Sequence, residues 1–270
     1  MKFRGYTIVT DMDGTLLNSR GKLSDENIGA IKEFIAQGGN FTVATGRMLP
    51  SVERFLDRIN LTLPAIVYNG TKIYDFKTRE TIFQIFLEEH RKSVIKKISE
   101  RNPSLGIEVY ADETIYIYRS CKHTERFSKT GYDVIYDVKD DLFQKNWAKV
   151  LIIGEKEEMD LLENIYAEEY EEGPIVRTGD RYLELAPYNT SKGHALEVLC
   201  HKLDIDKSKL ITIGDNMNDS ELLKVGNFGF CVENGTERLK KEAKYIAPSN
   251  DNHVMEYICL VYTSDAADEG

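Results

Sequence analysis

Long hydrophobic runs are absent from this sequence of 270 residues. The longest apolar stretches, such as residues 151–153, span only a few positions, whereas a helix that crosses a membrane needs about 20. The first apolar segment, residues 6–10, stops at Asp11 and is too short and too acidic for the core of a signal peptide. These features argue against a transmembrane span and against a secretory signal.

Closely spaced cysteines are also absent. The four cysteines stand far apart and form no C-x-x-C pair: Cys121, Cys200, Cys231 and Cys259. This spacing fits neither a disulfide framework nor a cysteine-based zinc site, and it is typical of proteins in the reducing cytosol. We therefore expect a cytoplasmic protein.

The chain also has no excess of positive charge. The chain has 35 Lys and Arg against 45 Asp and Glu, which gives a formal net charge of −10. That balance argues against nucleic acid or an anionic membrane as the main partner. A small anionic substrate remains compatible, because local charge can oppose the net charge of the chain. No pattern in the sequence indicates an oligomeric state.

Strand and helix patterns alternate at both ends of the chain. Before residue 84 the sequence predicts strands at 6–10, 41–44 and 65–68, a helix between Ser24 and Gly38, and a second helix with apolar positions from Val52 to Ile59. From Ser191 the pattern resumes with a helix to about residue 203, a strand at 210–213, a helix near 219 and a strand at 228–232. This alternation predicts a parallel sheet with right-handed crossovers.

The pattern changes between these two segments. Paired strands, at 107–110 with 115–118 and at 175–177 with 183–186, are combined with a strand at 149–153 and helices near 88–101 and 155–169, which indicates an α+β unit. We therefore predict an α/β protein in which a Rossmann-like parallel-sheet core domain, residues 1–83 and 188–258, carries an inserted α+β cap domain, residues 84–187. Residues 259–270 show neither periodicity nor a stop signal, so we expect a frayed or non-native tail without function.

Two carboxylates follow the first predicted strand, in Asp11-Met12-Asp13-Gly14-Thr15. Residues two apart in an extended chain point to the same side, so Asp11 and Asp13 face one crevice at the sheet edge where open α/β proteins bind ligands. Two carboxylates at that place are unfavourable unless a cation compensates them. A solvated acidic turn is the alternative, but the pattern D-x-D-G-T occurs by chance in about one of several hundred such chains, which favours a functional site.

Polar residues also follow the next two predicted strands. In Thr45-Gly46-Arg47 a hydroxyl and glycine amides precede a helix, an arrangement that can hold an anion, although Thr-Gly is also a common turn. Asn69-Gly70 is a turn signal.

The segment after the insertion adds a lysine and a second acidic cluster. Lys192 lies in the first turn of a predicted helix, where the positive end of the helix dipole disfavours a cation, so it requires a nearby anion or else extends into solvent. Asp215 and Asp219 follow the strand at 210–213, in Gly214-Asp215-Asn216-Met217-Asn218-Asp219. The two acidic residues also suit helix capping, which is the structural alternative.

In combination these motifs resemble those of the haloacid dehalogenase superfamily, and within it the Cof-type phosphatases with a type-IIB α/β cap. Four motifs match in order, and the resemblance extends to about Ile258: Asp11–Thr15, Thr45–Arg47, Lys192-Gly193 and Gly214–Asp219. The resemblance implies a Mg²⁺-dependent phosphatase that hydrolyses small phosphorylated metabolites, such as sugar phosphates or phosphorylated cofactors, through an aspartyl-phosphate intermediate.

The resemblance also implies a role for each matching residue. Asp11 would be the nucleophile and Asp13 the general acid and base. The phosphoryl group would be bound by Thr45, Gly46, Lys192 and Asn218. Mg²⁺ would be held by Asp11, the backbone carbonyl of Asp13 and Asp215, with Asp219 and Arg47 supporting these groups.

Three other functions are compatible with parts of this pattern. A phosphomutase or a sugar-phosphate phosphatase of the same superfamily would share the core motifs, and Asp13 suits both hydrolysis and mutase chemistry. A signalling receiver domain is about half this length, and an acidic residue at position 13 would shorten its phosphorylated state. A catalytically silent regulator is disfavoured because every motif residue is present.

Substrate choice is expected to depend on the cap. The candidate contacts are Tyr116, Tyr118, Arg119, His123 and Arg181. Aromatic residues on a cap strand commonly belong to its core, so a structural role is the alternative for the two tyrosines.

Overall fold

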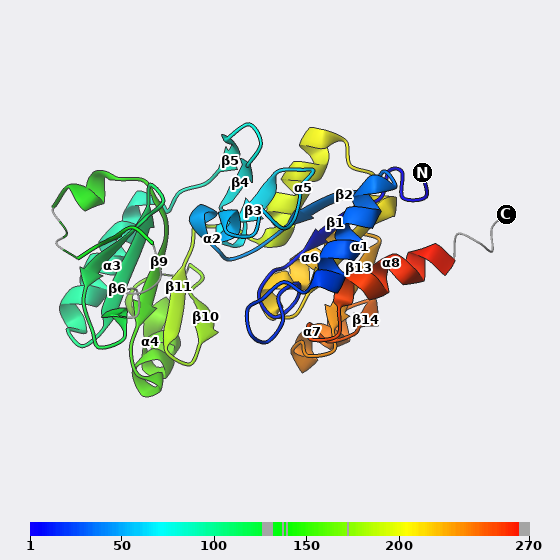
Figure 1. Ribbon diagram of the computed structural model, residues 1–270. Coiled ribbons are helices and arrows are strands. Elements are labelled where there is room, and N and C mark those ends of the chain that lie inside the picture. The colour runs from blue at the N-terminus through cyan, green and yellow to red at the C-terminus, as the bar shows by residue number, and fades with distance from the viewer. Residues whose placement is uncertain (126–131, 137, 139, 172, 265–270) are drawn as a thin grey trace. The chain divides into compact units, whose positions relative to one another are not determined.

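The computed structural model of the chain divides into two compact units (Figure 1). We call residues 1–84 with 190 onward the core unit, and residues 85–189 the inserted unit. The structure describes residues 1–125, 132–136, 138, 140–171 and 173–264. The boundaries expected from the sequence, 83/84 and 187/188, lie within two residues of this division, and the role of the inserted unit as a cap stays a prediction.

Five parallel strands form the main sheet of the core unit, in the order β14-β13-β12-β1-β2. They are β1 (Thr7–Thr10), β2 (Asn40–Val43), β12 (Leu210–Gly214), β13 (Phe228–Val232) and β14 (Tyr245–Ala247). β1 is central, because Thr7–Thr10 pair with residues 210–213 on one side and 40–43 on the other. All four residues of β1 are buried, and the carboxyl ends of β1, β2 and β12 lie at one edge. The predicted α/β class with a parallel-sheet core is therefore confirmed.

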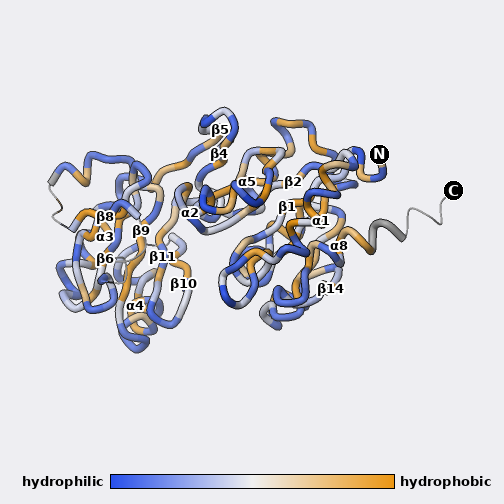
Figure 2. Tube along the Cα trace, in the orientation of Figure 1, coloured by the Kyte–Doolittle hydropathy of each residue, from blue (hydrophilic) through white to orange (hydrophobic). Residues whose placement is uncertain are grey.

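Helices flank this sheet. They are α1 (Asp25–Ala36), α2 (Leu49–Glu53), α5 (Lys192–Leu203), α6 (Ser220–Val225), α7 (Glu237–Glu242) and α8 (Val254–Ser264). α1 packs against α8, whereas α5 packs against α6, which contacts β12 and β13. The expected cap of α1 is present, since the backbone N–H of Asn27 donates to Oγ of Ser24 over 3.2 Å. Figure 2 shows hydrophobic residues along inner strands such as β1 and hydrophilic residues in many of the loops.

Two helices differ from the sequence-based expectation. α2 ends at Glu53, well before Ile59, and single turns follow it at Phe55 and Leu56. α8 continues to Ser264 and therefore includes the first six residues of the expected tail, 259–264. Packing explains the extension, because α8 lies against α1 and Sγ of Cys259 donates to the carbonyl of Ala30 over 3.7 Å. The rest of the expected tail, 265–270, lies outside the described residues.

A small antiparallel sheet completes the core unit. It consists of β3 (Ala65–Val67), β4 (Lys72–Asp75) and β5 (Glu80–Gln84) in that order. The sequence predicts β3 as a further strand of the parallel sheet, and it does meet the end of β2 through a parallel bridge between Ala44 and Ile66. The hairpin of β4 and β5 was not predicted.

The inserted unit has its own sheet and core. Six strands in the order β10-β11-β9-β6-β7-β8 pair antiparallel except for β7 with β8: β6 (Gly106–Ala111), β7 (Thr114–Arg119), β8 (Val134–Ile135), β9 (Trp147–Ile153), β10 (Val176–Gly179) and β11 (Tyr182–Leu185). Two helices, α3 (Glu89–Arg101) and α4 (Lys156–Glu169), contribute Ile95, Ile98, Met159 and Leu162 to one core with Val150 and Ile152 of β9. The predicted α+β architecture of the insertion is therefore confirmed. Within the described part of the chain, no helix is long and apolar enough to span a bilayer.

Candidate active site

A buried carboxylate follows β1. The side chain of Asp11 is 6% exposed, and its backbone N–H donates to the carbonyl of Ile213 on β12 over 2.9 Å. Burial raises the pKa of Asp11 to about 8, and the nearby ammonium of Lys192 opposes this rise. The fold thus holds a carboxylate where its charge requires compensation.

Lys192 supplies part of that compensation from the first turn of α5. Its ammonium lies 2.6 Å from Oδ1 of Asp11 and 2.6 Å from Oδ1 of Asp219, and its side chain is 1% exposed. Burial alone would lower the pKa of Lys192, but the two carboxylates outweigh this effect and raise the pKa. The unfavourable position of a lysine at a helix N-terminus is explained by these two anions, and an exposed lysine is not what the structure shows.

Asp219 organises the turn that follows β12. Its Oδ2 accepts hydrogen bonds from the backbone N–H groups of Asp215 and Asn216, at 3.0 and 3.3 Å. Both oxygens of Asp219 are therefore engaged, one by Lys192 and one by the turn. This arrangement suits a supporting residue better than a metal ligand.

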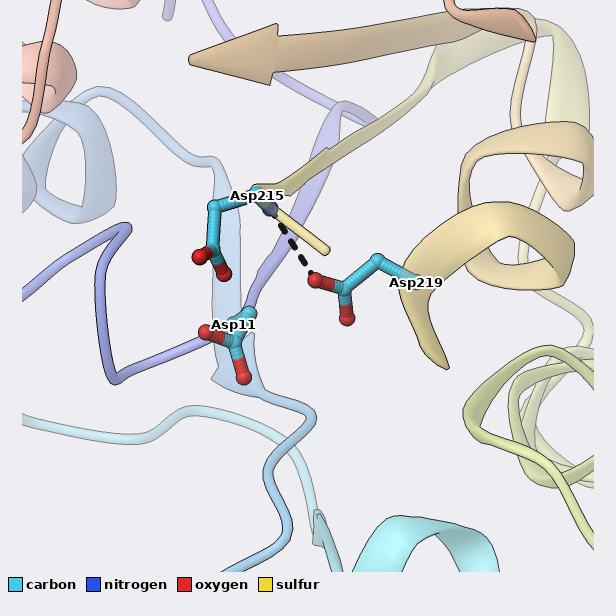
Figure 3. Close-up of side chains that lie close together, drawn as sticks. All are labelled: Asp11, Asp215 and Asp219. Atoms are coloured by element: carbon cyan, nitrogen blue, oxygen red, sulfur yellow. Dashed lines mark hydrogen bonds between the residues drawn. The ribbon is translucent and has the colours of Figure 1, made fainter. Parts of the chain in front are cut away.

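Asp215 completes a cluster of three carboxylates (Figure 3). One oxygen each from Asp11, Asp215 and Asp219 lie within 4.8 Å of one another. Burial, followed by the charge of Asp219, raises the pKa of Asp215 to about 6. Gly14 permits the close approach, since a Cβ there would lie 2.6 Å from Oδ2 of Asp215, and its φ is +79°.

The cluster fits a hard divalent cation. Three carboxylates face one ammonium, so a cation bound between Asp11 and Asp215 would relieve the remaining repulsion. Carboxylate oxygens are the ligands that Mg²⁺ takes in proteins, usually one or two of them with water and phosphate oxygens. Asp13 does not join the cluster through its side chain, which leaves its backbone carbonyl as the contribution that the resemblance implies.

The side chain of Asp13 instead forms a two-pronged ion pair with Arg47. Nε of Arg47 lies 2.7 Å from Oδ2, and Nη2 lies 2.6 Å from Oδ1. The guanidinium also donates to Oγ of Ser51 over 2.9 Å and lies over the ring of Phe55. Arg47 is thus fixed by its own neighbours and holds an aspartate whose side chain is 57% exposed.

The expected phosphate-binding residues lie on loops around this cluster. Thr45 is buried after β2, and its hydroxyl accepts a hydrogen bond from the N–H of Arg47 over 3.2 Å. Gly46 follows it, and Asn218 lies on the turn after β12. Nδ2 of Asn218 donates to Oδ1 of Asn69 over 3.2 Å, which links this turn to the one after β3.

Two features of the site were not found by sequence reasoning. The pairing of Arg47 with Asp13 has no signal in the spacing of these residues. Asn69 had a weak signal, the Asn-Gly pair at the end of a predicted strand, and was interpreted as a turn.

The five candidate residues of the insertion do not form one cluster. Tyr116 and Tyr118 pack against the core of the inserted unit, as in the structural alternative. Arg119 donates to Oγ of Ser99 on α3 over 2.8 Å. His123 and Arg181 both contact the carboxylate of Glu155 at the start of α4, at 3.2 and 3.3 Å.

Comparisons with known proteins agree with this architecture. The family model of haloacid dehalogenase-like hydrolases matches residues 8–258. M6_Spy0533 of Streptococcus pyogenes serotype M6, which is named as a phosphatase, is 29% identical over 254 residues. The match covers 91% of this chain and 93% of that protein. The 5-amino-6-(5-phospho-D-ribitylamino)uracil phosphatase YwtE of Bacillus subtilis is 27% identical over 279 residues, or 93% of this chain and 95% of that protein.

A solved structure shows the same fold. The subclass IIB sugar phosphatase BT4131 superposes with a TM-score of 0.80 at 18% sequence identity, covering 96% of this chain and 99% of that one. The match to the family model spans nearly the whole chain, so this protein belongs to the haloacid dehalogenase-like hydrolases. The expected Cof-type membership and the expected enzyme class, a phosphatase of this superfamily, are confirmed by the family match together with the names of the two relatives given above.

Proposed function

We propose that this protein is a Mg²⁺-dependent phosphatase that hydrolyses small phosphorylated metabolites through a phosphorylated Asp11. The observation that carries the proposal is the buried cluster in which Lys192 bridges Asp11 and Asp219 beside Asp215. One unit charge on a carboxylate and one on a phosphate repel each other by about 4 kcal/mol at 4 Å and an effective dielectric constant of 20. A site that brings them together therefore needs cations, and this cluster holds one and fits a second.

The first half of the reaction would transfer the phosphoryl group to the protein. An oxygen of Asp11 attacks phosphorus while the bond to the leaving oxygen breaks, and Asp13 gives its proton to that oxygen. Asp11 and Asp215 would hold a bound Mg²⁺, which would supply positive charge that lets the phosphate approach. Lys192 neutralises the developing charge, and Thr45 and Asn218 offer uncharged donors.

The second half would release inorganic phosphate. Asp13, now a carboxylate, takes a proton from a water molecule, and the water oxygen attacks phosphorus as the bond to Asp11 breaks. Arg47 bears on this step because its two hydrogen bonds fix the plane of the Asp13 carboxyl group. The proposal thus gives the exposed Asp13 and the buried Asp11 different tasks.

The substrate class is proposed from the relatives. YwtE is named for a phosphorylated ribitylaminouracil and BT4131 for sugar phosphates, both of which are small phosphate monoesters. We extend this class to the present protein, with the inserted unit as the cap that selects the leaving group. The net charge of −10 does not oppose a small anion, because the cations act locally.

Phosphate release tests the proposal directly. A set of about a hundred phosphorylated metabolites and nitrophenyl phosphate would be assayed with Mg²⁺, after EDTA and after Mg²⁺ is added back. We expect turnover that disappears with EDTA and returns with Mg²⁺, and Asp11→Asn should retain less than about 1% of kcat while its fold is unchanged. Turnover that survives exhaustive chelation contradicts the metal requirement, and isomerisation without phosphate release would indicate a phosphomutase.

A further inference from the structure

The turn after β3 has an unusual backbone. Tyr68, Asn69 and Gly70 all have positive φ angles, of 52°, 55° and 99°. Glycine adopts this region freely and asparagine tolerates it, but a bulky residue such as Tyr68 rarely does. Backbone strain of this kind persists where surrounding contacts hold it, and it is frequent at functional sites.

Contacts with the proposed phosphate loops hold this turn. The N–H groups of Tyr68 and Asn69 donate to the carbonyls of Arg47 and Thr45, each over 3.0 Å. A Cβ at Gly70 would lie 2.1 Å from the carbonyl oxygen of Ser191, next to Lys192. The turn is therefore fixed between the loop that carries Thr45 and the start of α5.

The side chain of Asn69 points into the same group of loops. Its Oδ1 accepts a hydrogen bond from Nδ2 of Asn218 over 3.2 Å, and a Cβ at Gly46 would lie 3.0 Å from that oxygen. Asn69 is partly buried, whereas Asn218 is exposed. An exposed carboxamide is free to rotate, and the contact with Asn69 selects the orientation in which Asn218 presents its NH₂ group.

We infer that Asn69 is a positioning residue for the phosphoryl group and acts through Asn218. By accepting one N–H of Asn218, it leaves the second N–H of that group to donate to a phosphoryl oxygen and keeps the carbonyl oxygen of Asn218 away from the anion. The strained turn serves to place this one acceptor. The inference rests on the proposed phosphatase function and assigns to Asn69 a task that goes beyond forming a turn.

The test removes the side chain and retains the backbone. Glycine accepts a φ of 55°, so Asn69→Gly removes the acceptor without adding strain. The matched control is Arg79→Gly, at an exposed residue of the core unit with a φ of 59°. Asn218→Ala and the double variant Asn69→Gly/Asn218→Ala complete a double-mutant cycle. The measurements are kcat and KM with nitrophenyl phosphate, the affinity for inorganic phosphate by calorimetry, and the melting temperature.

We expect Asn69→Gly to lower kcat/KM about tenfold and to weaken phosphate binding, while Arg79→Gly changes neither by as much as twofold. In the Asn218→Ala background, Asn69→Gly should reduce kcat/KM by less than twofold, because the group through which it acts is gone. Equal losses in both backgrounds, or no loss in either, would overturn the inference. So would a melting temperature for Asn69→Gly more than about 5 °C below that of Arg79→Gly, which would assign Asn69 to the support of the fold. A wild-type protein without phosphatase activity would instead refute the proposed function, and phosphate binding would then show separately whether Asn69 acts on the anion.

Discussion

Replacement of Lys192 by methionine is the sharpest test of the charge balance in the site. Methionine fills a similar volume, so the change removes the ammonium with little loss of packing. Asp11, Asp215 and Asp219 then face one another without the cation that contacts two of them at 2.6 Å. We expect three consequences, for activity, for stability and for the response to Mg²⁺.

The magnitudes follow from the burial of the pair. Loss of one charged donor to a transferring phosphoryl group costs about 3 kcal/mol in kcat/KM, or roughly 150-fold. Removal of one partner from a buried ion pair costs about 3–5 kcal/mol of stability. The side chains of Lys192, Asp11 and Asp219 are 1%, 6% and 0% exposed, so this figure needs no discount for solvent screening. For a protein of this size it corresponds to a melting temperature lower by roughly 6–20 °C in the presence of EDTA.

Mg²⁺ should restore much of that stability, because the divalent cation can take over the compensation of the carboxylates. The assay is thermal unfolding of wild type and Lys192→Met, each with EDTA and with Mg²⁺, together with steady-state kinetics. Lys149→Met is the matched control, since Lys149 is also buried and lies 2.6 Å from Glu184 but belongs to the inserted unit. Its melting temperature should fall without rescue by Mg²⁺.

The reasoning fails if Lys192→Met loses less than twofold in kcat/KM. It also fails if Mg²⁺ stabilises wild type and Lys192→Met equally, because the lysine and the metal would then not share the same carboxylates.

Two further predictions concern Asp13 and Glu155. In Asp13→Asn, nitrophenyl phosphate should give a rapid burst of nitrophenol, near one per site, followed by slow turnover. Sugar phosphates should give neither a burst nor turnover, because their alkoxide leaving group needs a proton. Equal loss for both leaving groups in rapid-quench kinetics would show that Asp13 takes no part in acid–base chemistry. Hydrogen bonds from Lys122 and then His123 lower the pKa of Glu155 to about 2, so its contribution to stability is present above about pH 4.5 and declines as the pH falls toward 2. Melting curves of Glu155→Gln and wild type should therefore differ at pH 6 and converge near pH 2, and a constant difference would contradict this assignment.

The arrangement of strands could be predicted because each strand carries its own local signal. Apolar runs such as Thr7–Thr10 end at charged or glycine residues, and Ser24 marks the start of α1 with its own hydrogen bond. Parallel strands place their carboxyl ends together, so residues that follow β1, β2 and β12 were expected to meet at one edge. The hairpin of β4 and β5 was missed because neither strand alternates regularly between buried and exposed positions.

The contacts within the site depend on side-chain rotamers and on backbone angles set by distant segments, and neither can be read from the order of residues. Asp13 was expected to face the same crevice as Asp11, yet its side chain turns to Arg47, a choice made by rotamers and by the fixed position of the guanidinium between Ser51 and Phe55. The φ angles of Tyr68 and Asn69 result from contacts with segments more than 20 residues away. Periodicity and spacing describe neither of these effects.

The two acidic residues after β12 illustrate how structure gives a physical reason for roles that the local pattern leaves equal. Both Asp215 and Asp219 suit helix capping, and the resemblance alone implies metal binding for Asp215 and a supporting role for Asp219. One oxygen of Asp219 accepts a hydrogen bond from Lys192, and the other accepts hydrogen bonds from backbone N–H groups. Its lone pairs are therefore directed at protein donors. Asp215 accepts a weaker contact of 3.3 Å from Thr15, and its carboxylate lies beside Asp11 against Gly14. A cation at this place would therefore be held by Asp11 and Asp215, while Asp219 fixes the distance between them by holding Lys192 and the turn at once.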